Sequence, residues 1–145
     1  RLVGSEMCIR DRRKLIDTWF RGDLMGMPGD EDGGGMTAFV VFSMMGIYPV
    51  TPGIPVYNIG TPFFSKVTLR LASGRTFVIE AEGASSENKY IQKATLNGKP
   101  LDRPWIRHSD LAAGGKLVFT MGSRPNKSWG ATTPPPSAER VELTE

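Results

Sequence analysis

Apolar and polar positions follow a helical period near the start of the chain. From Arg13 onward, one face is apolar and the opposite face carries Lys14, Asp17 and Arg21. The apolar positions are Leu15, Ile16, Trp19 and Phe20. Gly22 is of a residue type that ends helices. The pattern therefore predicts a first helix that starts at Arg13 and stops before Gly22.

A second helix is predicted at about residues 36–45, with Thr37 or a glycine near its cap and Gly46 at its end. It has almost no polar face, because its side chains include Met36, Ala38, Phe39, Val40, Val41, Phe42, Met44 and Met45. A helix that is apolar all round is buried on every side. The 145 residues contain one other clear helix and cannot easily surround it. The pattern therefore predicts partner helices that this chain lacks.

Beyond the second helix the period shortens to two. Three prolines within residues 49–55 exclude a helix there and predict an extended connector. Alternation then predicts strands at 66–71, 76–82, 90–96, 99–101 and 116–121. The dipeptide Asn97-Gly98 is typical of a hairpin turn between two of them. This half of the chain is therefore predicted to be rich in β-structure.

A short helical turn is predicted before Gly114-Gly115, with Ser109 or Asp110 as its cap. The last stretch, 131–145, contains three consecutive prolines and few large apolar residues, which predicts an extended, flexible tail. The whole pattern predicts an α+β chain. Helices occupy 13–50, and a small, mostly antiparallel β domain with short helices occupies 51–130.

The composition is that of a soluble globular protein with one ordinary core. Of the 145 residues, 39% are hydrophobic and 23% are charged, and the net charge is +3. The basic residues are scattered among acids, so no nucleic-acid partner is predicted. The longest apolar run is too short to span a bilayer, so no membrane span is predicted. The single cysteine, Cys8, excludes an internal disulfide and a Cys-based metal site.

Residues 1–12, RLVGSEMCIRDR, resemble a translated sequencing-adapter peptide that recurs in assembled genomic sequences. We therefore expect this segment to be artefactual. The chain does not begin with Met, and no hydrophobic signal peptide opens it. These features favour its interpretation as a fragment.

The stretch richest in candidate catalytic side chains, PGDEDGGGMT at 28–37, leads into the second predicted helix. Its glycines allow backbone conformations that a Cβ would forbid. One interpretation is structural, because carboxylates are stabilised by the free N–H groups of a helix start. The other is catalytic: side chains two apart in an extended backbone project to the same side. Asp30 and Asp32 can then converge on one water as a general base, and spacing alone leaves both interpretations open.

Other candidate sites fail on their spacing. Asp30, Asp32 and Gly35 match positions one, three and six of an EF-hand loop, but Val41 stands where a bidentate acid is required. No lysine follows the glycines as a phosphate-binding loop needs. His108 is the single histidine and has no nucleophile motif beside it, so a surface or hydrogen-bonding structural role is predicted.

Residues 29–50 resemble the signature near the end of the catalytic barrel in glycoside hydrolase family 92, the calcium-dependent exo-acting α-mannosidases. Further segments that resemble this family are 52–64, 88–91, 96–101, 108–111 and 114–115. The resemblance extends from about residue 13 to residue 130. The family often has Asn where Asp30 stands and Gln where Gly35 stands.

The resemblance implies a bacterial enzyme, periplasmic or secreted, with a β-sandwich domain followed by an (α/α) barrel. It implies hydrolysis of terminal α-mannosides of glycans with inversion, as in N-glycan degradation. Asp32 is implied as the general base, Asp30 as sharing or orienting the same water, and Glu31 as pointing elsewhere. Calcium is implied for the full-length enzyme, but no metal ligand and no substrate-binding residue is assigned in this chain. The general acid is implied in an upstream segment.

The chain is accordingly interpreted as the C-terminal fragment of such an enzyme. Residues 13–50 would be the last barrel helices with the catalytic-base turn, and 51–130 a C-terminal α+β domain. The fragment would pack against the missing barrel and β-sandwich and be inactive by itself. The alternative is a non-catalytic carbohydrate-binding or structural β module that packs on a helical barrel.

Overall fold

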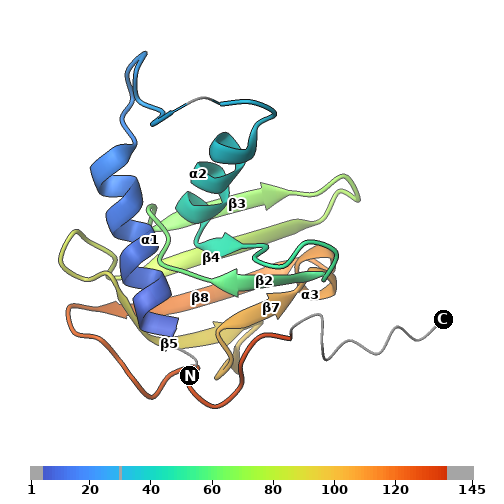
Figure 1. The fold of residues 1–145 in the computed structure, drawn as a ribbon. Helices are drawn as coiled ribbons and strands as arrows, with labels where there is room; N and C mark the ends of the chain where they lie inside the picture. The colour runs from blue at the N-terminus through green and yellow to red at the C-terminus, as the bar shows by residue number, and fades with distance from the viewer. Residues whose placement is uncertain (1–4, 30, 137–145) are drawn as a thin grey trace.

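The structure, a computed structural model, describes residues 5–29 and 31–136 (Figure 1). Within these ranges, helices α1 (Ser5–Trp19) and α2 (Gly35–Met45) precede the strands, and α3 (His108–Ala112) lies among them. The strands are β1 (Ile47–Tyr48), β2 (Val56–Ile59), β3 (Lys66–Arg70), β4 (Thr76–Glu82), β5 (Tyr90–Leu96), β6 (Lys99–Pro100), β7 (Trp105–Arg107) and β8 (Gly115–Gly122). The predicted α+β class is confirmed. No helix in the described ranges is both long and apolar enough to cross a bilayer.

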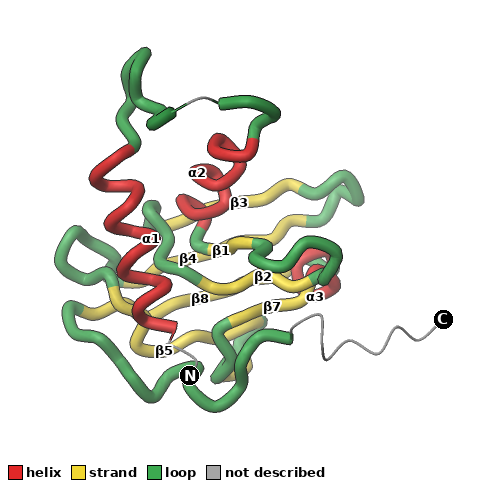
Figure 2. Tube along the Cα trace, in the orientation of Figure 1, coloured by secondary structure: helices red, strands yellow, loops and turns green. Residues whose placement is uncertain are grey.

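The strands form two sheets (Figure 2). The smaller sheet has the order β1-β2-β7 and the larger one the order β3-β4-β8-β5-β6. In the larger sheet β4 and β8 are parallel, and the other neighbouring strands are antiparallel. The prediction of a mostly antiparallel β part is therefore confirmed.

The hairpin between β5 and β6 turns at Asn97-Gly98, as predicted. Asn97 has φ 51° and Gly98 has φ 79°, and a two-residue hairpin turn with positive φ at both positions favours this dipeptide. The Asn97 side chain has a second role, because its Oδ1 accepts a hydrogen bond of 2.8 Å from the backbone N–H of Lys116. The turn is thereby tied to the start of β8.

All five strands of the larger sheet lie where the sequence predicts them, but the smaller sheet was not predicted. Its strands, β1, β2 and β7, are two to four residues long. The burial of β7 does not alternate, because Trp105 and Ile106 are both buried. Its pairing with β2 joins segments about fifty residues apart, with Tyr57 opposite Ile106. Neither feature gives a local period-two signal.

Two helix boundaries differ from the predictions. Helix α1 starts at Ser5, eight residues before the periodic stretch, because the preceding residues include good helix formers and no proline or glycine beyond Gly4. Residues 1–4 lie outside the described residues, and the artefactual origin of 1–12 stays a prediction.

In α3 the N-terminal cap is Arg107, not Ser109 or Asp110 as predicted. The Asp110 carboxylate, one turn inside, accepts a 3.0 Å hydrogen bond from the Arg107 N–H.

The described part of the tail, 131–136, contains no helix or strand. Trp105 Nε1 donates a 3.2 Å hydrogen bond to the carbonyl of Thr133 in this segment. Just before it, Trp129 is 7% exposed and its Nε1 donates to the Leu101 carbonyl at 2.8 Å. The prediction of a flexible tail for 137–145 lies outside the described residues.

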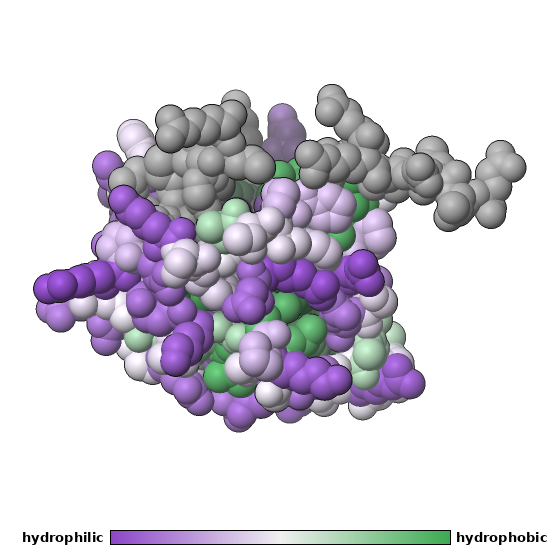
Figure 3. All heavy atoms as spheres, turned by 90° about the horizontal axis from the view of Figure 1, so that it is seen from below, coloured by the Kyte–Doolittle hydropathy of each residue, from purple (hydrophilic) through white to green (hydrophobic). Residues whose placement is uncertain are grey.

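One cluster of buried side chains joins the two sheets. Its fully buried members are Ile47, Phe77, Ile79, Ile106, Leu117 and Phe119. On the face shown in Figure 3, polar side chains surround a small apolar area. Because Ile47 follows α2 by two residues, the end of α2 is fixed to this core. The predicted domain boundary at residues 50/51 falls in the loop between β1 and β2 and stays a prediction.

Two lysines from neighbouring strands meet the carboxylate of Glu80 on the larger sheet. Lys116 Nζ lies 2.7 Å from Glu80 Oε2, and Lys66 Nζ lies 3.5 Å from Oε1. The hydrogen bond from Lys116 is the main cause that holds the pKa of Glu80 below its ordinary value of 4.5. The positive charges of both lysines act in the same direction, and desolvation acts against them.

We expect the stabilising contribution of Glu80 to depend on pH. Because its pKa is lowered in the folded state, the contribution is complete above the ordinary value of 4.5 and is lost as the pH falls through the folded-state value. The variant Glu80→Gln should therefore be less stable than the parent at pH 7. The difference in stability should shrink as the pH falls below 4.5. Urea unfolding of the chain between pH 7 and pH 3 measures it. Glu82→Gln, at an exposed carboxylate on the same strand, is the control and should show no such trend.

Candidate active site

The acidic stretch before α2, residues 28–34, is here called the acidic turn. It leads directly into α2 through a run of glycines. Gly33 and Gly34 have φ of 85° and 81°, a left-handed conformation that glycine adopts without steric cost. Gly34 is the N-cap of α2, and its carbonyl accepts a 2.9 Å hydrogen bond from the Ala38 N–H. At the other end Gly46, with φ 84°, is the C-cap. The predictions of this helix, of a glycine near its cap and of Gly46 at its end are confirmed.

Glu31 binds the start of α2. Its Oε2 accepts a 2.7 Å hydrogen bond from the backbone N–H of Thr37 and a 3.1 Å hydrogen bond from the Thr37 hydroxyl. Thr37 is the third residue of α2, so its N–H has no partner within the helix. A carboxylate at this end of a helix is also favoured by the helix dipole. The structural interpretation of the acidic turn is therefore correct for Glu31.

Asp32 has different surroundings from Glu31. It is exposed, and within the described residues its carboxylate makes no hydrogen bond or ion pair. Asp30, the other residue predicted to be catalytic, lies outside the described residues. The convergence of Asp30 and Asp32 on one water therefore stays a prediction. Asp32 itself is an exposed carboxylate one residue beyond an anchored one.

An aromatic row connects the helices to the β part. It runs through Phe20, Phe39, Tyr48, Phe42, Tyr57 and His108, with successive ring centroids 5.6–6.2 Å apart. At its end the Tyr57 hydroxyl and His108 Nδ1 are 2.9 Å apart. The hydrogen-bonding role predicted for His108 is therefore present. Sequence patterns do not reveal this row, because its members come from distant segments.

Helices α1 and α2 lie side by side (Figure 1), and each leaves apolar side chains exposed to solvent. Ser43 is the only buried residue of α2, and Val41 is 50% exposed. Trp19 of α1 is 60% exposed, and Leu24 and Met25 in the following loop are more exposed still. The described residues thus do not surround α2. Exposed apolar surface of this kind marks sites where other protein packs.

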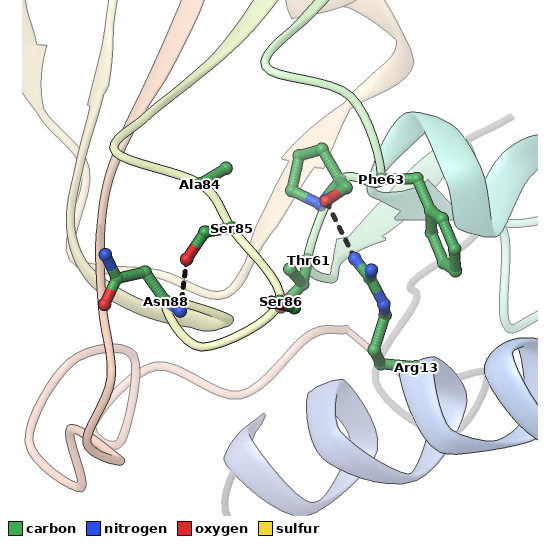
Figure 4. A pocket seen from close by; sticks show the side chains of 8 residues that line it. Arg13, Thr61, Phe63, Ala84, Ser85, Ser86 and Asn88 are labelled. Carbon is green, nitrogen blue, oxygen red and sulfur yellow. Dashed lines mark hydrogen bonds between the residues drawn. The ribbon is translucent and has the colours of Figure 1, made fainter.

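A small pocket of about 120 Å³ opens between α1, the loop after β2 and the loop between β4 and β5 (Figure 4). Arg13 stands at one side, where its Nη1 donates to the Pro62 carbonyl at 3.5 Å and its guanidinium lies 3.6 Å from the ring centre of Phe63. On the other side the Ser85 hydroxyl accepts a 2.9 Å hydrogen bond from the Asn88 N–H. The lining includes no carboxylate, so the pocket provides no general acid or base.

Glu31 and Asp32 do not form a calcium site with other described residues. In the described ranges, no three His, Cys, Asp or Glu side chains are grouped as metal ligands would be. Glu31 is occupied at the start of α2, and a single exposed carboxylate such as Asp32 supplies too few of the six to eight oxygens that calcium takes. Calcium therefore stays a prediction for the full-length enzyme, and no catalytic step is derived through it.

Comparison with known proteins identifies similar sequences and structures. The sequence profile of the glycosyl hydrolase family 92 catalytic domain matches residues 6–123. An uncharacterized secreted glycosidase of Arthroderma benhamiae is 42% identical over 118 residues, which cover 79% of this chain and 15% of the fungal protein.

Two solved structures from Bacteroides thetaiotaomicron are also similar. The family GH92 inverting mannosidase BT2199 has a TM-score of 0.82 and 41% identity over 88% of this chain and 17% of its own. The family GH92 α-mannosidase BT3965, in complex with mannoimidazole, has a TM-score of 0.85 and 30% identity over 92% of this chain and 18% of its own. This chain therefore spans less than a fifth of the length of each relative.

Proposed function

Because the chain belongs to glycoside hydrolase family 92, we propose that it is part of an inverting exo-acting α-mannosidase and carries the general base of that enzyme. The observation that carries the proposal is the similarity to the inverting mannosidase BT2199, at 41% identity and a TM-score of 0.82 over 88% of this chain. The substrate would be a glycan that ends in an α-linked mannose. The product would be free mannose in the β configuration.

In the proposed mechanism Asp32 removes a proton from the attacking water. The water reaches the anomeric carbon from the face opposite the leaving group, while a carboxylic acid protonates the leaving oxygen. The two carboxyl groups of an inverting enzyme lie about 6.5–9.5 Å apart so that water fits between them. Neighbouring residues of one turn do not provide this spacing, so the acid belongs to another segment. The exposure of Asp32 and its lack of a partner among the described residues support its role as the base.

Asp30 would share or orient the same water, and calcium would be bound by residues of other segments. The apolar side chains that α1 and α2 leave exposed would pack against the rest of the barrel. This packing explains why a helix as apolar as α2 is left uncovered here. The secreted fungal glycosidase supports export of the enzyme, to the periplasm or the medium.

The stereochemistry of the first product tests the proposed function. The full-length protein that contains this chain should hydrolyse an α-mannoside, and ¹H NMR during the first turnovers should detect β-mannose before mutarotation. Release of α-mannose first would overturn inversion. Binding of mannosides with no hydrolysis would favour the alternative, a carbohydrate-binding module.

The 145-residue chain by itself should release no mannose. Inverting hydrolysis needs the acid and the base together, and in the proposed mechanism the acid belongs to a segment outside this chain. Mannose release by the purified chain should therefore equal that of a mock purification from the same host. Release above that background would place the acid within this chain.

A further inference from the structure

We propose that Glu31 is a positioning residue that anchors the acidic turn to α2 and thereby directs Asp32 toward the substrate. This inference rests on the proposed function of Asp32 as the base. It assigns a positioning role to Glu31 because, among the described acids of the turn, Glu31 is hydrogen-bonded to the helix. The side-chain hydrogen bonds that join the described part of the turn to α2 are both made by Glu31.

The turn needs an anchor because its glycines provide none. Gly33, Gly34 and Gly35 follow one another, and a Cβ built on any of them would meet no atom within 4 Å. They are therefore not held by packing, and glycine has the greatest backbone freedom to lose on folding. The two hydrogen bonds from Glu31 to Thr37 close a loop across these glycines. They fix the backbone on both sides of the flexible run.

The anchor also determines which way Asp32 points. The two neighbouring side chains of the turn differ in their exposure to solvent. Glu31 is half-buried against α2, and Asp32 is exposed. While Glu31 is bound to Thr37, the Asp32 carboxylate is therefore held outward. Release of the anchor would let the base move, and a displacement of about 1 Å can cost a catalytic group about 100-fold in rate.

The contacts of Glu31 also indicate which substitution preserves the anchor. Both hydrogen bonds end on Oε2, while Oε1 is enclosed and has no hydrogen-bond partner in the described part of the chain. Glutamine has a similar shape and can place its amide oxygen where Oε2 lies, so it accepts both bonds without a negative charge. Alanine removes both bonds. Glu31→Gln is therefore the matched control for Glu31→Ala.

The experiment is a double-mutant cycle in the full-length enzyme. Rates are followed with an activated aryl α-mannoside, so that slow variants remain measurable, and thermal unfolding of each variant gives its folded fraction. We expect Glu31→Ala to lower kcat by about 10- to 100-fold with little change in KM. Glu31→Gln should stay within about 3-fold of the parent, because it keeps the anchor. The variant that combines Glu31→Ala with Asp32→Asn should be no slower than Asp32→Asn, because Glu31 acts only through Asp32.

Each other outcome overturns a defined part of the proposal. Losses that multiply in the double variant would make Glu31 a structural residue that acts independently of Asp32. A Glu31→Gln variant as slow as Asp32→Asn would make Glu31 itself a catalytic acid or base. If Glu31→Ala kept the kcat of the parent while Asp32→Asn had a low kcat, the anchor role of Glu31 would be contradicted and the proposed function would stand. If Asp32→Asn kept the kcat of the parent, the assignment of Asp32 as the base would be contradicted, and so would the positioning role of Glu31.

Discussion

Replacement of Asp32 by Asn in the full-length enzyme is expected to lower kcat by about 10³-fold, within the 10²- to 10⁴-fold that general acid–base catalysis contributes. Asparagine keeps the size of the side chain but cannot take a proton from water. KM should change little, because the interaction is made with the attacking water in the transition state. Initial rates of mannose release over a range of substrate concentrations measure both parameters.

Two controls separate loss of the base from loss of structure. Asp102→Asn alters an exposed aspartate that makes no described hydrogen bond or ion pair, and it should leave kcat unchanged. Azide needs no deprotonation before it attacks, so it should restore turnover in Asp32→Asn and give the β-mannosyl azide. Unchanged turnover in Asp32→Asn would contradict the assignment. A slow variant that azide does not rescue would point to a defect other than the missing base.

The larger sheet could be predicted from the sequence because one of its faces is buried. In β4, Phe77, Ile79 and Ala81 face the core while their neighbours are partly or fully exposed, and this alternation is a local signal. The smaller sheet gives no such signal. Its strands are held by pairing between distant segments, as where Asn58 lies opposite Trp105. Local periodicity cannot anticipate a contact of this range.

The acidic turn could be located from its sequence, but the separate roles of Glu31 and Asp32 within it could not be predicted. Spacing showed that acids two apart share a side, and it left the structural and catalytic interpretations open. The structure shows that Glu31 takes the structural role through Thr37, six residues later. That contact depends on the left-handed backbone of Gly33 and Gly34. Glycine can adopt either hand, so its presence does not specify the path of the chain.

Truncation of Phe119 should have the largest effect on stability among the substitutions considered, because its ring fills the centre of the larger sheet. Phe119 is 0% exposed. It lies on β8 between Ala81 of β4 and Ala94 of β5, which are its partners in register. Both neighbours are small, so neither can extend into the space that the ring vacates. Phe119→Ala should therefore lower the free energy of unfolding by about 3–5 kcal/mol, a large part of the 5–15 kcal/mol typical of a domain.

Urea unfolding of the chain, followed by tryptophan fluorescence, measures this loss. Trp105 and Trp129 are each 7% exposed and report on the β part, whereas Trp19 is already 60% exposed in the folded chain. Phe64→Ala is the matched control, because Phe64 is 52% exposed and its truncation should cost at most about 1 kcal/mol. Equal losses in the two variants would contradict a core centred on Phe119. A loss confined to Phe119→Ala would support it.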